Sequence, residues 1–199
     1  MQITSLAKIT APSAQEICQL AAAGGHQLSP PPGASPVEFL SQLVSARELE
    51  AAVKFLAFGL PKREAVWWAC VCARMELPEP AQEPVLNALV AAETWVRKPT
   101  DENRRAAMAS AQAAKFESPA AWAAVAAFWS SGSMAPPDLP EVPAAPHLMG
   151  VAVLGSVTLA AVLKNPELAD EKRERYLAAA VNIANGGNGR VPATGMGTH

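Results

Sequence analysis

The chain has 199 residues, of which 50% are hydrophobic and 17% are charged, and its formal net charge at pH 7 is −2. This length fits one domain, or at most two small ones, with enough apolar side chains for a sizeable core. The charge provides no basic face of the kind that displaces counterions from nucleic acid, so no nucleic-acid partner is expected. Abundant alanine and few Tyr, Thr and Ile residues favour helices over strands.

Two capping boxes mark the first predicted helices. The patterns at 13–16 (SAQE) and 35–38 (SPVE) each place a serine three residues before a glutamate, and the second adds a proline at the first helical position. Residues 24–34, rich in glycine and proline, are expected to form the loop between these helices. The second helix is expected to end near Ala46, or to continue with a bend to Phe58.

The most apolar segment of the chain follows a break at 59–61 (GLP). It contains nine consecutive uncharged residues, 65–73, with Trp67 and Trp68 side by side. A helix that is apolar on every face is buried nearly all round. We therefore expect a helix from this break to about Met75 at the centre of a helical domain, with both tryptophans in the core.

The next two helices are predicted at 84–97 and 101–116. The first has an apolar stripe that includes Trp95, and a proline after it stops the helix. Thr100 is positioned to cap the second helix, whose acidic start suits the helix dipole.

A further helix is predicted to begin after Ser118, with Trp122 and Trp129 on one apolar stripe. Residues 132–147 then form a long proline-rich connector, which is expected to run extended over the surface.

Residues 148–163 are sixteen uncharged residues in succession. A membrane-spanning helix needs roughly 20, so we expect a buried helix here, with membrane association through 148–163 as the minor alternative. A charged helix is predicted at 167–185, and the glycine-rich remainder, 186–199, is predicted to be a flexible tail. The first residues lack the pattern of a signal peptide, so a cytoplasmic location is expected.

Two segments resemble each other at an offset of 69 residues, where Asp101-Glu102 aligns with Asp170-Glu171. Each pair opens a charged helix after an apolar helix and a proline turn. A duplication of helical hairpins, as in α-solenoids, would explain the similarity. Convergence of two hairpins under the same capping rules would explain it equally well, and both interpretations stay open.

The sequence contains no recognisable catalytic or metal-binding motif. The three histidines have no cysteine or carboxylate at metal-ligand spacing, and there is no nucleophile elbow, P-loop or dinucleotide-binding glycine pattern. Cys18, Cys70 and Cys72 are expected to be small core residues in a reducing compartment. We therefore expect no cofactor, no metal and no enzymatic activity.

Lys62 and Arg63 stand out because they lie in the first turn of the central helix, where cations oppose the helix dipole by roughly 0.3–1 kcal/mol each. Together with the free N–H groups of that turn, they form a candidate site for an anion or for an acidic segment of a partner. The alternative is that they pair with acids on neighbouring helices, such as Glu48 or Glu50.

The other basic clusters, at 104–105 and 172–175, lie beside acids and are expected on solvated, salt-bridged faces. The tryptophans of the later helices belong mainly to the core, but an exposed one is a candidate anchor for a partner. The candidate partner-binding residues are Lys62, Arg63, Trp95, Trp122 and Trp129.

The run at 58–70, FGLPKREAVWWAC, resembles an uncharacterised bacterial family of helical proteins encoded near type VI secretion genes. The resemblance extends over roughly 14–185, although only this run is distinctive. It implies an accessory role, such as an adaptor or co-chaperone that helps to load a secreted effector. It supplies no catalytic residues.

These features predict an all-α fold of about eight or nine helices packed as antiparallel hairpins, either as an irregular orthogonal bundle or as a short α-solenoid. Residues 1–185 are predicted to form one domain. The favoured function is a non-enzymatic protein-binding module with a protein partner, for which the proline-rich connector is a further contact surface. The alternatives are a small-ligand-binding protein or enzyme with a pocket between helices, and membrane association.

Overall fold

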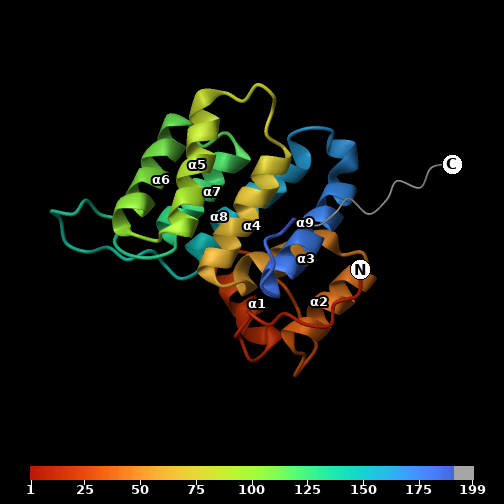
Figure 1. The fold of residues 1–199 in the computed structure, drawn as a ribbon. Coiled ribbons are helices and arrows are strands. Elements are labelled where there is room, and N and C mark those ends of the chain that lie inside the picture. Colours follow the sequence, from red (N-terminus) through yellow and green to blue (C-terminus); the bar gives the residue numbers. More distant parts are fainter. Residues whose placement is uncertain (191–199) are drawn as a thin grey trace.

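Residues 1–190, which the computed structural model describes, form nine α-helices and one short 3-10 helix and contain no strand (Figure 1). The fold is all-α, as the composition and the apolar spacing predicted. The helices are α1 (Ala14–Ala23), α2 (Pro36–Ser45), α3 (Leu49–Gly59), α4 (Lys62–Met75), α5 (Glu83–Arg97), α6 (Asp101–Ala113), α7 (Pro119–Trp129), α8 (Leu148–Val162), the 3-10 helix η1 (Pro166–Leu168) and α9 (Ala169–Ala184).

Side-chain caps begin four of these helices where the sequence predicted them. The hydroxyls of Ser13, Ser35, Thr100 and Ser118 each accept a hydrogen bond from the backbone N–H three residues on, at 3.2–3.4 Å. Such a bond satisfies a donor that has no partner inside the helix. Only the second predicted capping box is complete, because Glu38 reaches back to the Ser35 N–H (2.8 Å), whereas no such return bond accompanies Ser13.

Left-handed backbone conformations mark three helix boundaries. Arg47 has φ 59° and separates α2 from α3, so the predicted end near Ala46 is confirmed and the continuous bent helix is not formed. The other two boundaries differ from the predicted ones. Lys115 and Phe116 have φ 54° and 59° and end α6 before the predicted residue. Asn165 has φ 47° and is followed by η1, so α9 begins only at Ala169. Sequence patterns identify helices better than they identify such ends.

The centre of the structure is formed by α4, α7 and α8, which pack against one another. Nine of the eleven residues of α7 are buried, and α8 is buried on most of its surface. Trp68 is fully buried, as expected, and its indole N–H donates to the Tyr176 carbonyl of α9 (2.8 Å). Trp67 is only half-buried, so the expectation of a core position was wrong for that ring.

The helices form an irregular bundle and not a solenoid. In a solenoid each repeat contacts only its neighbours in the chain. Here α4 packs against α5, α7, α8 and α9, and α3 packs against α8 and α9. The hairpin prediction fits α5 and α6, which lie side by side (Figure 1), but α8 and the segment Pro166–Ala184 meet at a bend of 116°.

Within the described residues, no single helix has both the length and the apolar character that a membrane crossing requires. Only the bent pair of α8 with Pro166–Ala184 meets the length and composition requirement together. The apolar side chains of α8 are used in contacts with α3, α4 and α7.

Both ends of the described chain pack against the helices. Ile3 and Leu6 are buried, and the Lys8 N–H donates to the Ala184 carbonyl at the end of α9 (2.8 Å). Residues 186–190 belong to the predicted tail but contact α4. The Trp67 indole N–H of that helix donates to the Asn188 carbonyl (3.0 Å). The rest of the predicted tail, 191–199, lies outside the described residues.

Replacing Gly150 of α8 by alanine tests how closely α8 approaches α3. A Cβ at this position would lie 2.4 Å from Cδ1 of Phe58, so the ring or the helix would have to move. We expect the free energy of unfolding to fall by about 1–3 kcal/mol, measured by urea denaturation.

The matched control is Gly155→Ala in the same helix. A Cβ there would meet the Trp122 ring at 3.6 Å, an ordinary contact. Alanine has the higher helix propensity, so we expect no loss, or a gain of up to about 1 kcal/mol. Equal losses from the two variants would contradict the close approach at Gly150.

Candidate functional site

The predicted Lys62–Arg63 site lies at the start of α4, after Pro61, which provides no side-chain cap. Arg63 donates through Nε to the Val96 carbonyl (2.6 Å) near the end of α5, where helix carbonyls lack partners. Lys62 is exposed and forms no ion pair with a described residue. Both cations therefore remain without a described acid opposite them.

The alternative ion pairs with Glu48 or Glu50 are not formed. Glu50 pairs instead with Arg173 of α9 (2.8 Å), because α3 packs along α9. The acid nearest to Lys62 and Arg63 in the chain, Glu64, pairs with Lys8 (2.7 Å).

An open hollow of about 340 Å³ lies beside this turn. Its lining includes Lys8, Arg63, Arg97 and the exposed part of Trp67, with Glu64 as the one acid. We call Lys62 and these three cations the basic corner. Lys8 and Arg97 have acidic partners, Glu64 at 2.7 Å and Glu93 at 3.8 Å, so the excess positive charge comes from the first turn of α4.

The three predicted tryptophan anchors do not join this corner. Trp95 is 4% exposed and belongs to the core, so its ring is not accessible to a partner. Trp122 and Trp129 are half-buried on α7. Trp122 lines a separate hollow of about 370 Å³ between α3 and α8, together with Lys54 and Val151.

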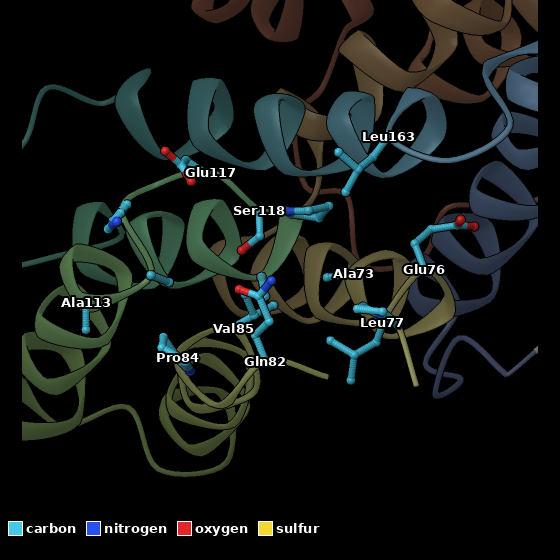
Figure 2. A pocket seen from close by; sticks show the side chains of 15 residues that line it. Ala73, Glu76, Leu77, Gln82, Pro84, Val85, Ala113, Glu117, Ser118 and Leu163 are labelled. Atoms are coloured by element: carbon cyan, nitrogen blue, oxygen red, sulfur yellow. The ribbon is translucent and has the colours of Figure 1, made fainter. Parts of the chain in front are cut away.

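A cleft that the sequence did not indicate lies at the opposite end of α4 (Figure 2). Its volume is about 410 Å³, and its walls come from the ends of α4 and α8, the start of α5 and the loop between α6 and α7. Figure 2 shows Leu163 and Leu77 on facing sides, with Gln82 and Val85 along the floor. Most of the lining is apolar, which is typical of small-molecule pockets.

Glu76 supplies the buried charge of this cleft. Its side chain is 8% exposed, forms an ion pair with Lys172 Nζ and accepts a hydrogen bond from the Tyr176 hydroxyl, both at 2.8 Å. Burial and then the hydrogen bond to Glu76 raise the pKa of Tyr176 above its ordinary value. Lys172 also donates to the Lys164 carbonyl, so the ammonium is bound from two sides.

The expectation that Lys172 and Arg104 belong to solvated faces was wrong. Lys172 is 3% exposed and Arg104 is 1% exposed. The signal that could have identified them is helical spacing: Lys172 lies four residues before Tyr176 on the buried stripe of α9, and Arg104 lies three residues before the buried Ala107 of α6. A charged residue on an apolar stripe indicates a buried, paired charge.

The three cysteines are free and buried. Desolvation raises the pKa of Cys18 to about 11 and also raises the pKa of the buried Cys70 and Cys72, so none of these thiols is activated as a nucleophile. No group of three or more His, Cys, Asp or Glu side chains suited to a metal ion occurs in residues 1–190.

A family model described as a family of unknown function, DUF6931, matches residues 39–184, and the chain belongs to this family. The matched residues run from α2 to the end of α9 and therefore include the cleft and, apart from Lys8, the basic corner. No curated protein matches the chain, and no solved structure matches it.

The reactivity of the three cysteines tests whether they are buried as described. At pH 8 we expect none of them to react with Ellman's reagent within minutes in the folded protein, because their raised pKa values and burial keep the thiolate fraction small. All three should react in denaturant. A thiol that reacts rapidly under native conditions would contradict the buried arrangement.

Removing Lys172 should destabilise the fold strongly. Lys172→Met leaves the Glu76 carboxylate buried with only the Tyr176 hydroxyl as partner, and we expect a loss of about 3–5 kcal/mol in the free energy of unfolding. The exposed Lys164→Met is the control and should change stability by less than about 0.5 kcal/mol. Adding Glu76→Gln to Lys172→Met should restore part of the loss, and a further additive loss would contradict the pairing.

Proposed function

We propose that this chain is a non-enzymatic protein-binding module whose basic corner holds an acidic segment of a protein partner. The observation that carries this proposal is the pair Lys62 and Arg63 in the uncapped first turn of α4, with no described acid paired to either. Cations in that position oppose the helix dipole by roughly 0.3–1 kcal/mol each when exposed. A partner carboxylate would relieve this repulsion and accept from the free N–H groups of the turn.

The shape of the corner fits a peptide side chain better than a small metabolite. The hollow beside α4 is open, and its apolar lining is the exposed part of Trp67 together with Val96 and Ile183. The cations Lys8 and Arg97 line the same hollow. Aromatic and arginine side chains are the ones most enriched among residues that dominate protein interfaces.

The more specific proposal follows from the resemblance of residues 58–70. In it the chain is a cytoplasmic adaptor or co-chaperone that helps to load a type VI secretion effector, and the acidic segment belongs to that effector or to its chaperone. The extent of the DUF6931 match is compatible with such a role but does not test it.

The second candidate is a small-ligand-binding protein or enzyme that uses the cleft of Figure 2. The observation in its favour is an apolar cleft of about 410 Å³ with the carboxylate of Glu76 at its edge. However, both oxygens of that carboxylate already have partners in the protein, the Tyr176 hydroxyl and the Lys172 ammonium. The group therefore serves first to join α4 to α9.

The test is Lys62→Glu in the full chain. It should weaken binding of the partner at least tenfold and make binding less sensitive to salt, because screening acts on exposed charge pairs. The same change should leave the free energy of unfolding unchanged or raise it by about 0.3–1 kcal/mol, since an acid in the first turn favours the helix. Opposite effects on binding and on stability distinguish recognition from damage to the fold.

The partner is first captured with the tagged full chain from the cells that produce it naturally and identified by mass spectrometry, and its affinity is then measured with purified components. Lys164→Glu is the matched control, because it makes the same charge change at an exposed residue near the other end of α4. Equal affinity of the unmodified chain and Lys62→Glu would overturn the basic corner as the binding site.

Arg63→Glu is a less suitable variant. It removes the hydrogen bond to the Val96 carbonyl, so we expect it to lower the free energy of unfolding by about 1–2 kcal/mol as well as weaken binding. Thermal unfolding measured beside binding would separate the two effects.

A further inference from the structure

The tip of the connector between α7 and α8 is the longest run of exposed residues in the described chain. All eight residues of 136–143 (PPDLPEVP) are exposed, and Figure 1 shows the connector standing out from the helices beside α6. Six of the eight are apolar, and Leu139 is 54% exposed and Val142 is 49% exposed. Apolar residues exposed next to one another mark interaction surfaces more often than single exposed ones do.

The connector does not run extended over the surface as predicted, because it folds back on itself. The Met134 N–H donates to the Val142 carbonyl (2.7 Å), and the Val142 N–H donates to the Ser133 hydroxyl (3.0 Å). The Leu139 N–H closes a turn on the Pro136 carbonyl (3.1 Å). The backbone of the tip is therefore fixed internally, while its side chains point outward.

Two arginines of α6 hold the base of this tip. Arg104 is buried and donates to the carbonyls of Phe128 (2.9 Å) and Ser133 (2.8 Å), and its guanidinium lies 4.6 Å from the centre of the Phe128 ring. Arg105 donates to the Ala135 carbonyl (2.9 Å). Burying a guanidinium is unfavourable unless its donors are satisfied, so these bonds fix the backbone of the connector to α6.

Gly132 is required for this anchorage. Its φ of 67° is poorly accessible to other residues, and a Cβ there would lie 3.1 Å from two nitrogens of Arg104. Gly132 and Arg104 therefore fix the direction in which the connector leaves α7. The tip is ordered before a partner binds. Preorganisation of this kind reduces the entropy lost on binding.

The sequence of the tip has a period of three residues. Prolines occur at 137, 140, 143 and 146, and residues 140–145 contain neither helix nor strand apart from one isolated bridge at Pro143. The turn that the Leu139 N–H closes on the Pro136 carbonyl keeps the tip from forming one continuous polyproline II helix. The period nevertheless repeats the side-chain types, because Leu139 and Val142 lie three residues apart, as do Asp138 and Glu141.

The two acids of the tip have no counterpart in the described structure. Neither Asp138 nor Glu141 forms an ion pair with a described residue, and no lysine or arginine occurs between 116 and 163. A partner that covers this tip therefore needs apolar surface for the prolines, Leu139 and Val142, and positive charge for the two acids.

We propose that residues 136–146 are a docking segment for a second protein domain, one with an aromatic-lined groove and basic side chains on its rim. Such a groove offers apolar surface to the prolines, Leu139 and Val142, and a segment that is already ordered loses little entropy when it binds. This surface is separate from the basic corner and does not depend on the function proposed for it.

The experiment compares the full chain with the double variant Leu139→Ser/Val142→Ser. Both proteins are used to capture partners from cells that produce the chain naturally, and captured proteins are identified, purified and titrated by calorimetry. Leu86→Ser/Val90→Ser is the matched control, since it removes one exposed leucine and one exposed valine from α5. A synthetic peptide with the sequence of 136–146 serves as the competitor.

The proposal requires an identified partner whose affinity falls at least tenfold in the tip variant, is unchanged in the α5 control, and is reduced by the peptide. A partner that binds the tip variant normally but not Lys62→Glu would overturn the docking segment and support the basic corner. Loss of self-association alone, seen by analytical ultracentrifugation, would overturn it in favour of a second copy. Failure to capture any protein that depends on the tip would also overturn it.

Discussion

The fold depends on the small volume of the side chains along α7. Six alanines of this helix are at most 1% exposed, and they let α4 and α8 approach its backbone closely. The same constraint recurs where Gly150 of α8 meets Phe58 of α3, a contact with no room for a methyl group. Interiors packed at crystal-like density tolerate neither added volume nor cavities at such contacts. The position of each outer helix therefore follows from how closely these three central helices can approach.

Small apolar side chains bring helices together but do little to specify how the helices are oriented. In this chain a few charged side chains supply that specificity. Glu76, Lys172 and Tyr176 join α4 to α9. A bidentate ion pair between Arg74 and Glu93 joins α4 to α5, with both contacts at 2.8 Å. A buried pair such as Glu76 with Lys172 contributes little net stability compared with apolar residues, but losing one partner is strongly unfavourable. The Arg74 side chain is half-exposed, so its pair with Glu93 has a smaller effect. These pairs therefore select one arrangement of an alanine-rich bundle over its alternatives.

Sequence patterns predicted what is local and missed what depends on tertiary contacts. The caps at Ser35 and Thr100 lie three residues from their targets, so short-range chemistry decides them. The burial of Arg104 and Lys172 is different, because charge alone suggests solvent, and only the neighbouring apolar stripe indicates the interior. The cleft of Figure 2 could not be predicted, since its walls come from residues 73 to 163 and require the packing of five helices. The sequence could point to Lys62 and Arg63 because the unfavourable position of a cation in the first turn of a helix depends only on neighbouring residues.

The polar groups that lack a described partner lie on the surface and not in the interior. No buried side-chain nitrogen or oxygen in the described residues lacks a hydrogen-bond partner. Glu76 has a partner on each oxygen, and burial raises the pKa of each of the three thiols. The charges that find no described counterpart are cations at the start of α4 and acids at the connector tip. The two proposals above assign a partner of opposite charge to each of these surfaces, and the two surfaces are separate in the fold.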